Sequence, residues 1–319
     1  MIQKSWLLLF PPLSRRHAST AATVRLKNAK KKTKSVKNML MEAKKSGRGH
    51  LHYALSERVF DFQKNENNLF VGLDVSSRCT GIAVVDASGK GVAYHACETH
   101  RLCDVIEVGR TIRTDFKKLL SEVEIEFKSE SLSTIQWHAG VEACAKNFTR
   151  GRFNAKGLVK LAQINGISQY ICAEQLGTVP LLVNPSTART FFDLRTPPPP
   201  TTKAPPTPTT KGGGGARGAV EEKQPVKERV YDFVQRRDTM WIPDLTSKSR
   251  LDISDAFLIA WYTRVNQIFH MLANDHMLWS EFEICLLNIK PVSAKREAID
   301  VFHKYLWEWL REHKDFLSL

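Results

Sequence analysis

The chain has 319 residues, of which 42% are hydrophobic and 25% are charged, and its formal net charge is +14. This composition is ordinary for a soluble globular protein and allows one large domain with extensions or two modest ones. No apolar run approaches the roughly 20 residues that cross a bilayer, so we expect no membrane-spanning segment.

The positive charge is concentrated at the N-terminus, where residues 1–50 hold thirteen Lys and Arg and one acid, Glu42. Residues 1–25 lack acids and mix Arg15 and Arg16 with hydroxyl and bulky apolar residues, which is typical of an organellar transit peptide. A secretory signal is disfavoured because its apolar region should be longer than residues 6–10. We therefore predict cleavage near Arg25 and a location in the mitochondrial matrix.

Residues 26–66 begin with a dense run of lysines, and we expect them to form a largely disordered basic arm. Such arms commonly neutralise phosphates. A solvated tail and a nuclear-localisation stretch have the same composition, and the run alone does not decide among the three.

The six cysteines include no CxxC pair and are not joined to an HxxxH spacing. A zinc site is therefore disfavoured by the sequence. We expect reduced thiols that are buried as small apolar residues, as in a non-secreted protein.

From residue 69 onward, alternating and apolar runs predict three strands, a helix, a strand, a helix and a strand. The three leading strands, joined by short connections, predict an antiparallel meander. The expected elements are strands over 69–75, 80–86 and 91–98, a helix over 103–127, a strand over 134–143, a helix over 157–177 and a strand over 179–185.

Residues 196–219 are Pro/Thr-rich and then Gly-rich, which predicts a disordered insertion. It divides the expected domain into a first part over 67–195 and a second part over 220–275. Residues 276–319 are expected to form a C-terminal helical extension, whose last helix carries an apolar stripe typical of core packing.

Four acids stand where the chemistry of a site is expected. Asp74 and Glu142 each end an apolar strand, and Asp252 and Asp255 share one face of a later helix. A carboxylate in an apolar strand must be solvated by a hydrogen-bond network, a basic partner or a metal. Three of the acids also have a structural explanation: Asp74 as a cap of the turn at Ser76 or Ser77, and Asp252 and Asp255 as acids favoured by the helix dipole.

The chain resembles the RuvC family of Holliday junction resolvases, within the RNase H-like superfamily, over about residues 69–194 and 227–262. The resemblance implies an RNase H-like α/β fold with a mixed five-stranded sheet, in the order β-β-β-α-β-α-β-α, and helices on both faces. It also implies that Asp74, Glu142, Asp252 and Asp255 are the metal ligands. The stretches that carry it are GLDVSSRCTGIAVVD, GVEAC, KGLVKLAQINGISQYI, VNPSTART and SRLDISDAFLIA.

The activity implied by the resemblance is resolution of four-way junctions in organellar DNA by a homodimer. Two Mg²⁺ or Mn²⁺ ions, hard cations that prefer oxygen ligands, would promote phosphodiester hydrolysis at each site. Hydroxyl, basic and aromatic residues near the four acids are expected to contact the nucleic acid, although the aromatic ones also fit packing beneath a loop. These candidates are Ser76, Ser77, Lys146, Phe148, Arg150, Arg152, Lys156, Lys248 and Arg250.

Two other functions fit parts of the sequence. The long segments outside the catalytic motifs suit a nucleic-acid-binding component or assembly factor of a mitochondrial ribosome or ribonucleoprotein particle, which would contact structured RNA. The stretch GLDVSSRCTG also resembles the first phosphate loop of actin-like ATPases, but the only other glycine cluster lies in the low-complexity insertion.

Overall fold

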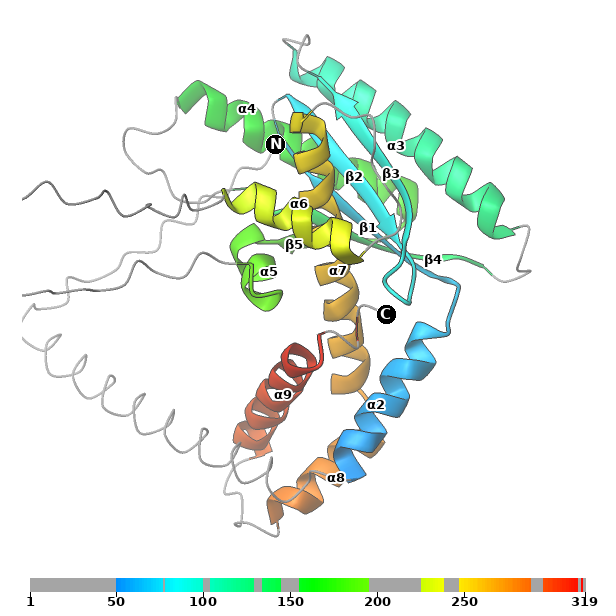
Figure 1. Cartoon of the computed structure of the whole chain (residues 1–319), viewed down its shortest axis with the longest axis vertical. Helices are drawn as coiled ribbons and strands as arrows, with labels where there is room; N and C mark the ends of the chain where they lie inside the picture. The colour runs from blue at the N-terminus through cyan, green and yellow to red at the C-terminus, as the bar shows by residue number, and fades with distance from the viewer. Residues whose placement is uncertain are drawn as a thin grey trace, which may run out of the picture. The chain divides into compact units, whose positions relative to one another are not determined.

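The computed structural model of the chain describes residues 50–76, 78–99, 104–128, 134–144, 155–194, 225–237, 247–287, 295–314 and 317. These residues form five strands and eight helices (Figure 1). The chain divides into two compact units, a larger one of residues 55–274 and 306–319 and a smaller one of residues 1–54 and 275–305. The predicted α/β class is confirmed, and the insertion and the proposed transit peptide lie outside the described residues.

A mixed five-stranded sheet in the order β3-β2-β1-β4-β5 forms the centre of the larger unit. The first three strands are antiparallel, and β4 is parallel to both β1 and β5. Both faces of β1 and β2 are covered, which explains their nearly continuous apolar sequences. The predicted meander and strand-helix order are confirmed. The strands are β1 (Asn68–Asp74), β2 (Cys79–Val85), β3 (Gly91–Glu98), β4 (Gln136–Glu142) and β5 (Leu181–Val183).

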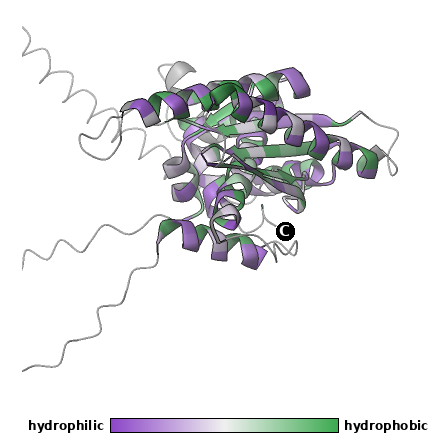
Figure 2. Cartoon of the chain, turned by 90° about the horizontal axis from the view of Figure 1, so that it is seen from above, coloured by the Kyte–Doolittle hydropathy of each residue, from purple (hydrophilic) through white to green (hydrophobic). Residues whose placement is uncertain are grey.

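Helices α3 (Val105–Lys128) and α4 (Ala155–Leu176) contact each other and cover one face of the sheet (Figure 1). The apolar stripe predicted for α3 is buried at Val108, Ile112 and Phe116 and packs with aliphatic residues of the strands. In the hydropathy colouring of Figure 2, the strands are largely hydrophobic and the helices carry both classes of residue. This face of the sheet is the main hydrophobic core of the larger unit.

Helix α7 (Ser247–Ala273) packs against the other face, where it contacts all five strands. Its backbone comes so close to the sheet that a Cβ at Gly72 would meet the main chain of Ala256, and one at Gly81 would meet that of Asp252. Helices α5 (Pro185–Phe191) and α6 (Val226–Arg237) contact α7 in turn. Glycines in β1 and β2 therefore determine how closely α7 approaches the strand ends.

The smaller unit contains α8 (His276–Leu287) and the beginnings of α2 (His50–Gln63) and of α9 (Lys295–Glu312). Its core is aromatic: the centroid of the Phe282 ring lies 4.9 Å from that of the Phe302 ring and 5.5 Å from that of the Tyr305 ring. The predicted C-terminal helical extension thus consists of two helices. Within the described ranges, no helix is both long enough and apolar enough to cross a membrane.

The structure corrects the sequence analysis in three elements. Residues 50–63, which the composition assigned to a largely disordered basic arm, form α2, because Leu51, Leu55 and Val59 recur at helical spacing and are buried. Helix α5 was not predicted, although Asn184 caps it and Pro185 follows the cap. The stripe predicted for α9 is buried except at Ile299, which is 36% exposed.

Candidate functional site

Two of the predicted acids end neighbouring parallel strands. Asp74 is the last residue of β1 and Glu142 the last of β4, and the register pairs Leu73 with Val141. Alternation along the strands turns both carboxylates toward the face that α7 covers, two residues beyond Gly72 and Gly140. The side-chain amide of Asn165 on α4 donates a 2.5 Å hydrogen bond to the main-chain oxygen of Glu142 and so fixes this strand end.

The other two predicted acids lie on α7, directly above those strand ends. Asp252 and Asp255 are 3% and 4% exposed. Their spacing of three residues places them on one side of the helix, and the missing side chain of Gly81 lets the helix backbone approach at Asp252. The structure therefore brings all four predicted acids together from three elements.

Burial and mutual repulsion change the proton affinity of the strand-end pair. Burial raises the pKa of Asp74 well above its ordinary value of 3.8, and the charges of Glu142 and Asp255 raise it further. Burial also raises the pKa of Glu142, whereas its hydrogen bond with Asp74 lowers it. The carboxylate cluster therefore binds protons more tightly than separate carboxylates would when no metal balances the charge.

Two cations that the sequence analysis did not assign lie among the acids. Lys227 Nζ, at the start of α6, is 2.7 Å from an oxygen of Asp252, 3.4 Å from one of Asp255 and 3.6 Å from one of Asp74. Burial alone would lower the pKa of Lys227, but these carboxylates raise it above its ordinary value. Arg189 Nη2, on α5, donates to both oxygens of Asp255 at 2.8 and 3.0 Å.

The donor set fits a cluster of hard divalent cations better than the two cationic side chains alone. When all four carboxylates are ionised, one lysine and one arginine leave two negative charges unbalanced. Asp74 Oδ2 and Asp252 Oδ2 are buried and have no hydrogen-bond partner among the described residues. The ammonium of Lys227 lies 3.6 Å from Asp74 Oδ2, which is beyond hydrogen-bond distance. Buried oxygens without a hydrogen bond are costly, and Mg²⁺ or Mn²⁺ is the kind of ion that such oxygens bind. Asp74, Glu142, Asp252 and Asp255 are thus the residues that could hold the ions.

The carboxylates are arranged around an ammonium group in this structure. Within the described residues, no three of the four place their oxygens all within 4.8 Å of one another. Asp74, Asp252 and Asp255 instead surround Lys227 Nζ. Lys227 Nζ thus supplies the positive charge that these three carboxylates face in this structure.

Only some of the predicted nucleic-acid contacts lie among the residues that the structure describes. The Ser76 hydroxyl stabilises the turn after β1, because it donates to the oxygen of Cys79 at 2.6 Å and accepts from its N–H. Lys156 is exposed at the start of α4, and the Arg250 guanidinium lies 4.8 Å from the centre of the Tyr231 ring. Ser77, Lys146, Phe148, Arg150 and Arg152, and the side chain of Lys248, lie outside the described residues.

The sequence carried only weak signals for the residues that were missed. Arg189 lies in the VNPSTART stretch, where it looks like a surface residue of a short helix. Lys227 follows the low-complexity insertion and has no local pattern around it. Comparison with known proteins adds no assignment, since no family model and no curated protein matches the chain.

Proposed function

We propose that the chain is a metal-dependent endonuclease with an RNase H-like fold that resolves four-way junctions in organellar DNA. The observation that supports it is the convergence of Asp74, Glu142, Asp252 and Asp255 at one edge of the sheet. The four acids come from the two strand ends and the late helix on which the RuvC-like resemblance depends. The β-β-β-α-β-α-β order is also the order expected for that fold.

The chemistry follows from the charges of the site. Two bound Mg²⁺ or Mn²⁺ ions would supply an activated water and stabilise the leaving oxygen of the phosphodiester. In the proposed enzyme the chain's four carboxylates would hold these ions, and metal binding would compete with protons for Asp74 and Glu142. Lys227 and Arg189, which lie beside these carboxylates, would offset the negative charge of a phosphate that approaches the site.

The experiment is a cleavage assay on the full chain with a synthetic four-way DNA junction, a linear duplex of the same sequence and an RNA junction, at one salt concentration. With Mg²⁺ or Mn²⁺ we expect paired nicks in the DNA junction only. Asp74→Asn should reduce the rate by at least about 100-fold, since even residues that only orient a metal ligand are worth 10–100-fold.

The matched control is Glu122→Gln, which neutralises an exposed acid of α3 that pairs with Lys118 outside the site. We expect it to cleave at the wild-type rate. Cleavage that survives in Asp74→Asn, or inertness toward every junction with both metals, contradicts the proposal. Inertness combined with binding to structured RNA or ribosomal particles would favour the ribonucleoprotein function instead.

A further inference from the structure

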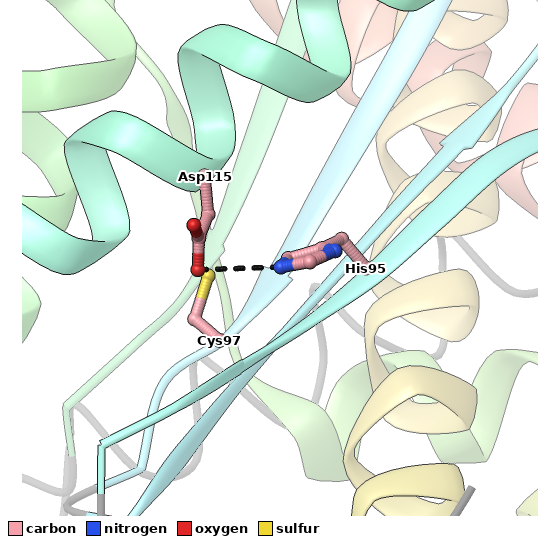
Figure 3. Close-up of side chains that lie close together, drawn as sticks. All are labelled: His95, Cys97 and Asp115. Atoms are coloured by element: carbon pink, nitrogen blue, oxygen red, sulfur yellow. Dashed lines mark ion pairs between the residues drawn. The ribbon is translucent and has the colours of Figure 1, made fainter.

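A second group of potential metal ligands lies on the opposite face of the sheet from the four acids. His95 and Cys97 are two residues apart on β3, so their side chains project from the same face, toward α3. Asp115 projects from α3 toward them (Figure 3). Three chemically different donors, an imidazole, a thiol and a carboxylate, therefore converge from two elements that pack against each other.

The distances are close to those of a tetrahedral metal site. His95 Nε2 lies 3.2 Å from Asp115 Oδ2. Bonds of about 2.1 Å from nitrogen and oxygen to Zn²⁺ place two tetrahedral ligands about 3.4 Å apart. The Cys97 sulfur completes a set whose ligand atoms all lie within 4.8 Å of one another.

An ion pair explains only part of this arrangement. The contact between His95 and Asp115 is an ordinary pair on a partly exposed surface, with side chains 41% and 28% exposed. It does not account for a fully buried thiol beside the carboxylate. Burial raises the pKa of Cys97, and the Asp115 carboxylate raises it further, so the thiol keeps its proton unless a metal displaces it.

We propose that His95, Cys97 and Asp115 bind a Zn²⁺ ion and leave its fourth position to water. Nitrogen and sulfur donors favour zinc over Mg²⁺, which suits the all-oxygen site of the four acids. The buried Cys97 places the ion against the core, whereas the partly exposed His95 and Asp115 give water access to it. The ion would link β3, the edge strand, to α3.

This site does not depend on the nuclease proposal, because it uses none of the four acids. Zinc binding should persist in Asp74→Asn, and junction cleavage can fail without affecting it. The thiol must lose its proton on binding, so the affinity for zinc should fall as the pH is lowered.

The test is a titration of the metal-free full chain with Zn²⁺ in excess Mg²⁺, which occupies the all-oxygen site, followed by Co²⁺ in place of Zn²⁺. We expect about one tightly bound zinc ion per chain, as for a site with three protein ligands and water. Co²⁺ should give a sulfur-to-cobalt absorption band. Cys97→Ser should remove the band, and His95→Gln should weaken zinc binding by at least about 100-fold.

Two controls keep the result interpretable. His95 is partly exposed, so His95→Gln tests the site even if the buried Cys97→Ser variant fails to fold. Cys144→Ser removes a half-buried thiol that lies two residues from Glu142, and we expect it to keep both the band and the affinity. Zinc affinity unchanged in His95→Gln, or a cobalt band lost in Cys144→Ser and kept in Cys97→Ser, would overturn the proposal.

Discussion

The face of the sheet that packs on α3 and α4 is lined by aliphatic side chains, whereas the face that packs on α7 combines glycines with carboxylates. Both faces of the sheet are covered by helices, but the helices lie at different distances from the strands. Aliphatic side chains keep α3 and α4 a side-chain layer away from the strands. On the other face, Gly72 and Gly81 let the backbone of α7 touch the strands, which places Asp252 and Asp255 over the strand ends.

The two faces also differ in the metals that they would bind. The α7 face presents only oxygen donors, compensated by Lys227 and Arg189. The α3 face presents His95, Cys97 and Asp115 at the border of an apolar core. The contrast shows how one sheet can separate a stabilising layer from a layer whose buried charges oppose folding unless a cation balances them.

The largest effect is expected where the two faces differ most, at the glycine contact. Gly72→Ala would push a Cβ into the main chain of Ala256 and Ala260, with no flexible side chain to move aside. We expect a loss of about 3 kcal/mol in the free energy of unfolding, the upper end for overpacking. Denaturant unfolding of the full chain measures it.

The matched control for that change is Gly166→Ala, in an exposed part of α4 where an added Cβ would meet nothing within 4 Å. It should raise stability by up to about 1 kcal/mol through helix propensity. Equal destabilisation by the two substitutions would show that the close approach of α7 is not what Gly72 provides.

The next effect concerns the most buried ion pair of the α7 face. Arg189→Ala removes the guanidinium that pairs with Asp255, whose side chain is 5% exposed. We expect about 2–3 kcal/mol of destabilisation in the metal-free protein, less than for a fully buried pair because Arg189 is 22% exposed. Arg189→Lys keeps the charge and should lose about half as much. Thermal unfolding with added Mg²⁺ should shrink both losses, and losses that do not depend on metal would contradict this reading.

Neutralising one acid of the α7 face should stabilise the metal-free protein, whereas the changes at Gly72 and Arg189 destabilise it. Since burial and repulsion raise the pKa of Asp74, the folded chain binds this proton more tightly than the unfolded chain. The stability that the folded chain gains from binding this proton is complete below pH 3.8, the ordinary pKa of the side chain. It is lost as the pH rises from there through the raised pKa. Asp74→Asn should therefore stabilise the metal-free protein by on the order of 1 kcal/mol near pH 7.

The pH dependence separates this effect from a general change in packing. The difference in melting temperature between Asp74→Asn and the wild type should grow from about pH 4.5 to pH 7.5 and vanish or reverse in excess Mg²⁺. A difference that is constant over this range would mean that the carboxyl of Asp74 is not protonated in the folded metal-free chain.

Sequence patterns predicted the order of strands and helices along the chain and singled out the four acids, because each depends on local pattern. A strand that is buried on both faces is a continuous apolar run, so a carboxylate at its end stands out, as at Asp74. Glu142 follows three buried residues at the end of β4, whose first three residues are not buried. Asp252 and Asp255 share a helical face by spacing alone. Their convergence, by contrast, depends on register and on the glycine contacts, which only the folded chain displays.

What the sequence analysis missed depends on contacts between distant residues. The CxxC and HxxxH spacings that indicate zinc are local in sequence, whereas the proposed site takes His95 and Cys97 from β3 and Asp115 from α3. Helix α2 was not predicted because residues 26–66 were assigned to a basic arm from their charge, although an apolar helical stripe begins at Leu51. Lys227 acquires its role only by meeting acids from β1 and α7.

That lysine provides the smallest and most discriminating test of the α7 face. Lys227→Met removes the ammonium that three acids surround but keeps the length of the side chain. The metal-free protein should lose only about 1 kcal/mol, because the lysine side chain is 45% exposed and solvent screens its pairs. The control Lys118→Met breaks an exposed pair on α3 and should change stability by less than about 0.5 kcal/mol.

If a metal and the ammonium compete for the same oxygens, the loss in the metal-free state becomes a gain in metal affinity. A cost of about 1 kcal/mol corresponds to about fivefold tighter Mg²⁺ binding by Lys227→Met, measurable by calorimetry. Weaker Mg²⁺ binding would mean that Lys227 holds the acids in place for the ion. Unchanged binding would mean that the ammonium, 2.7 Å from Asp252, and the divalent cation do not compete for the same oxygens.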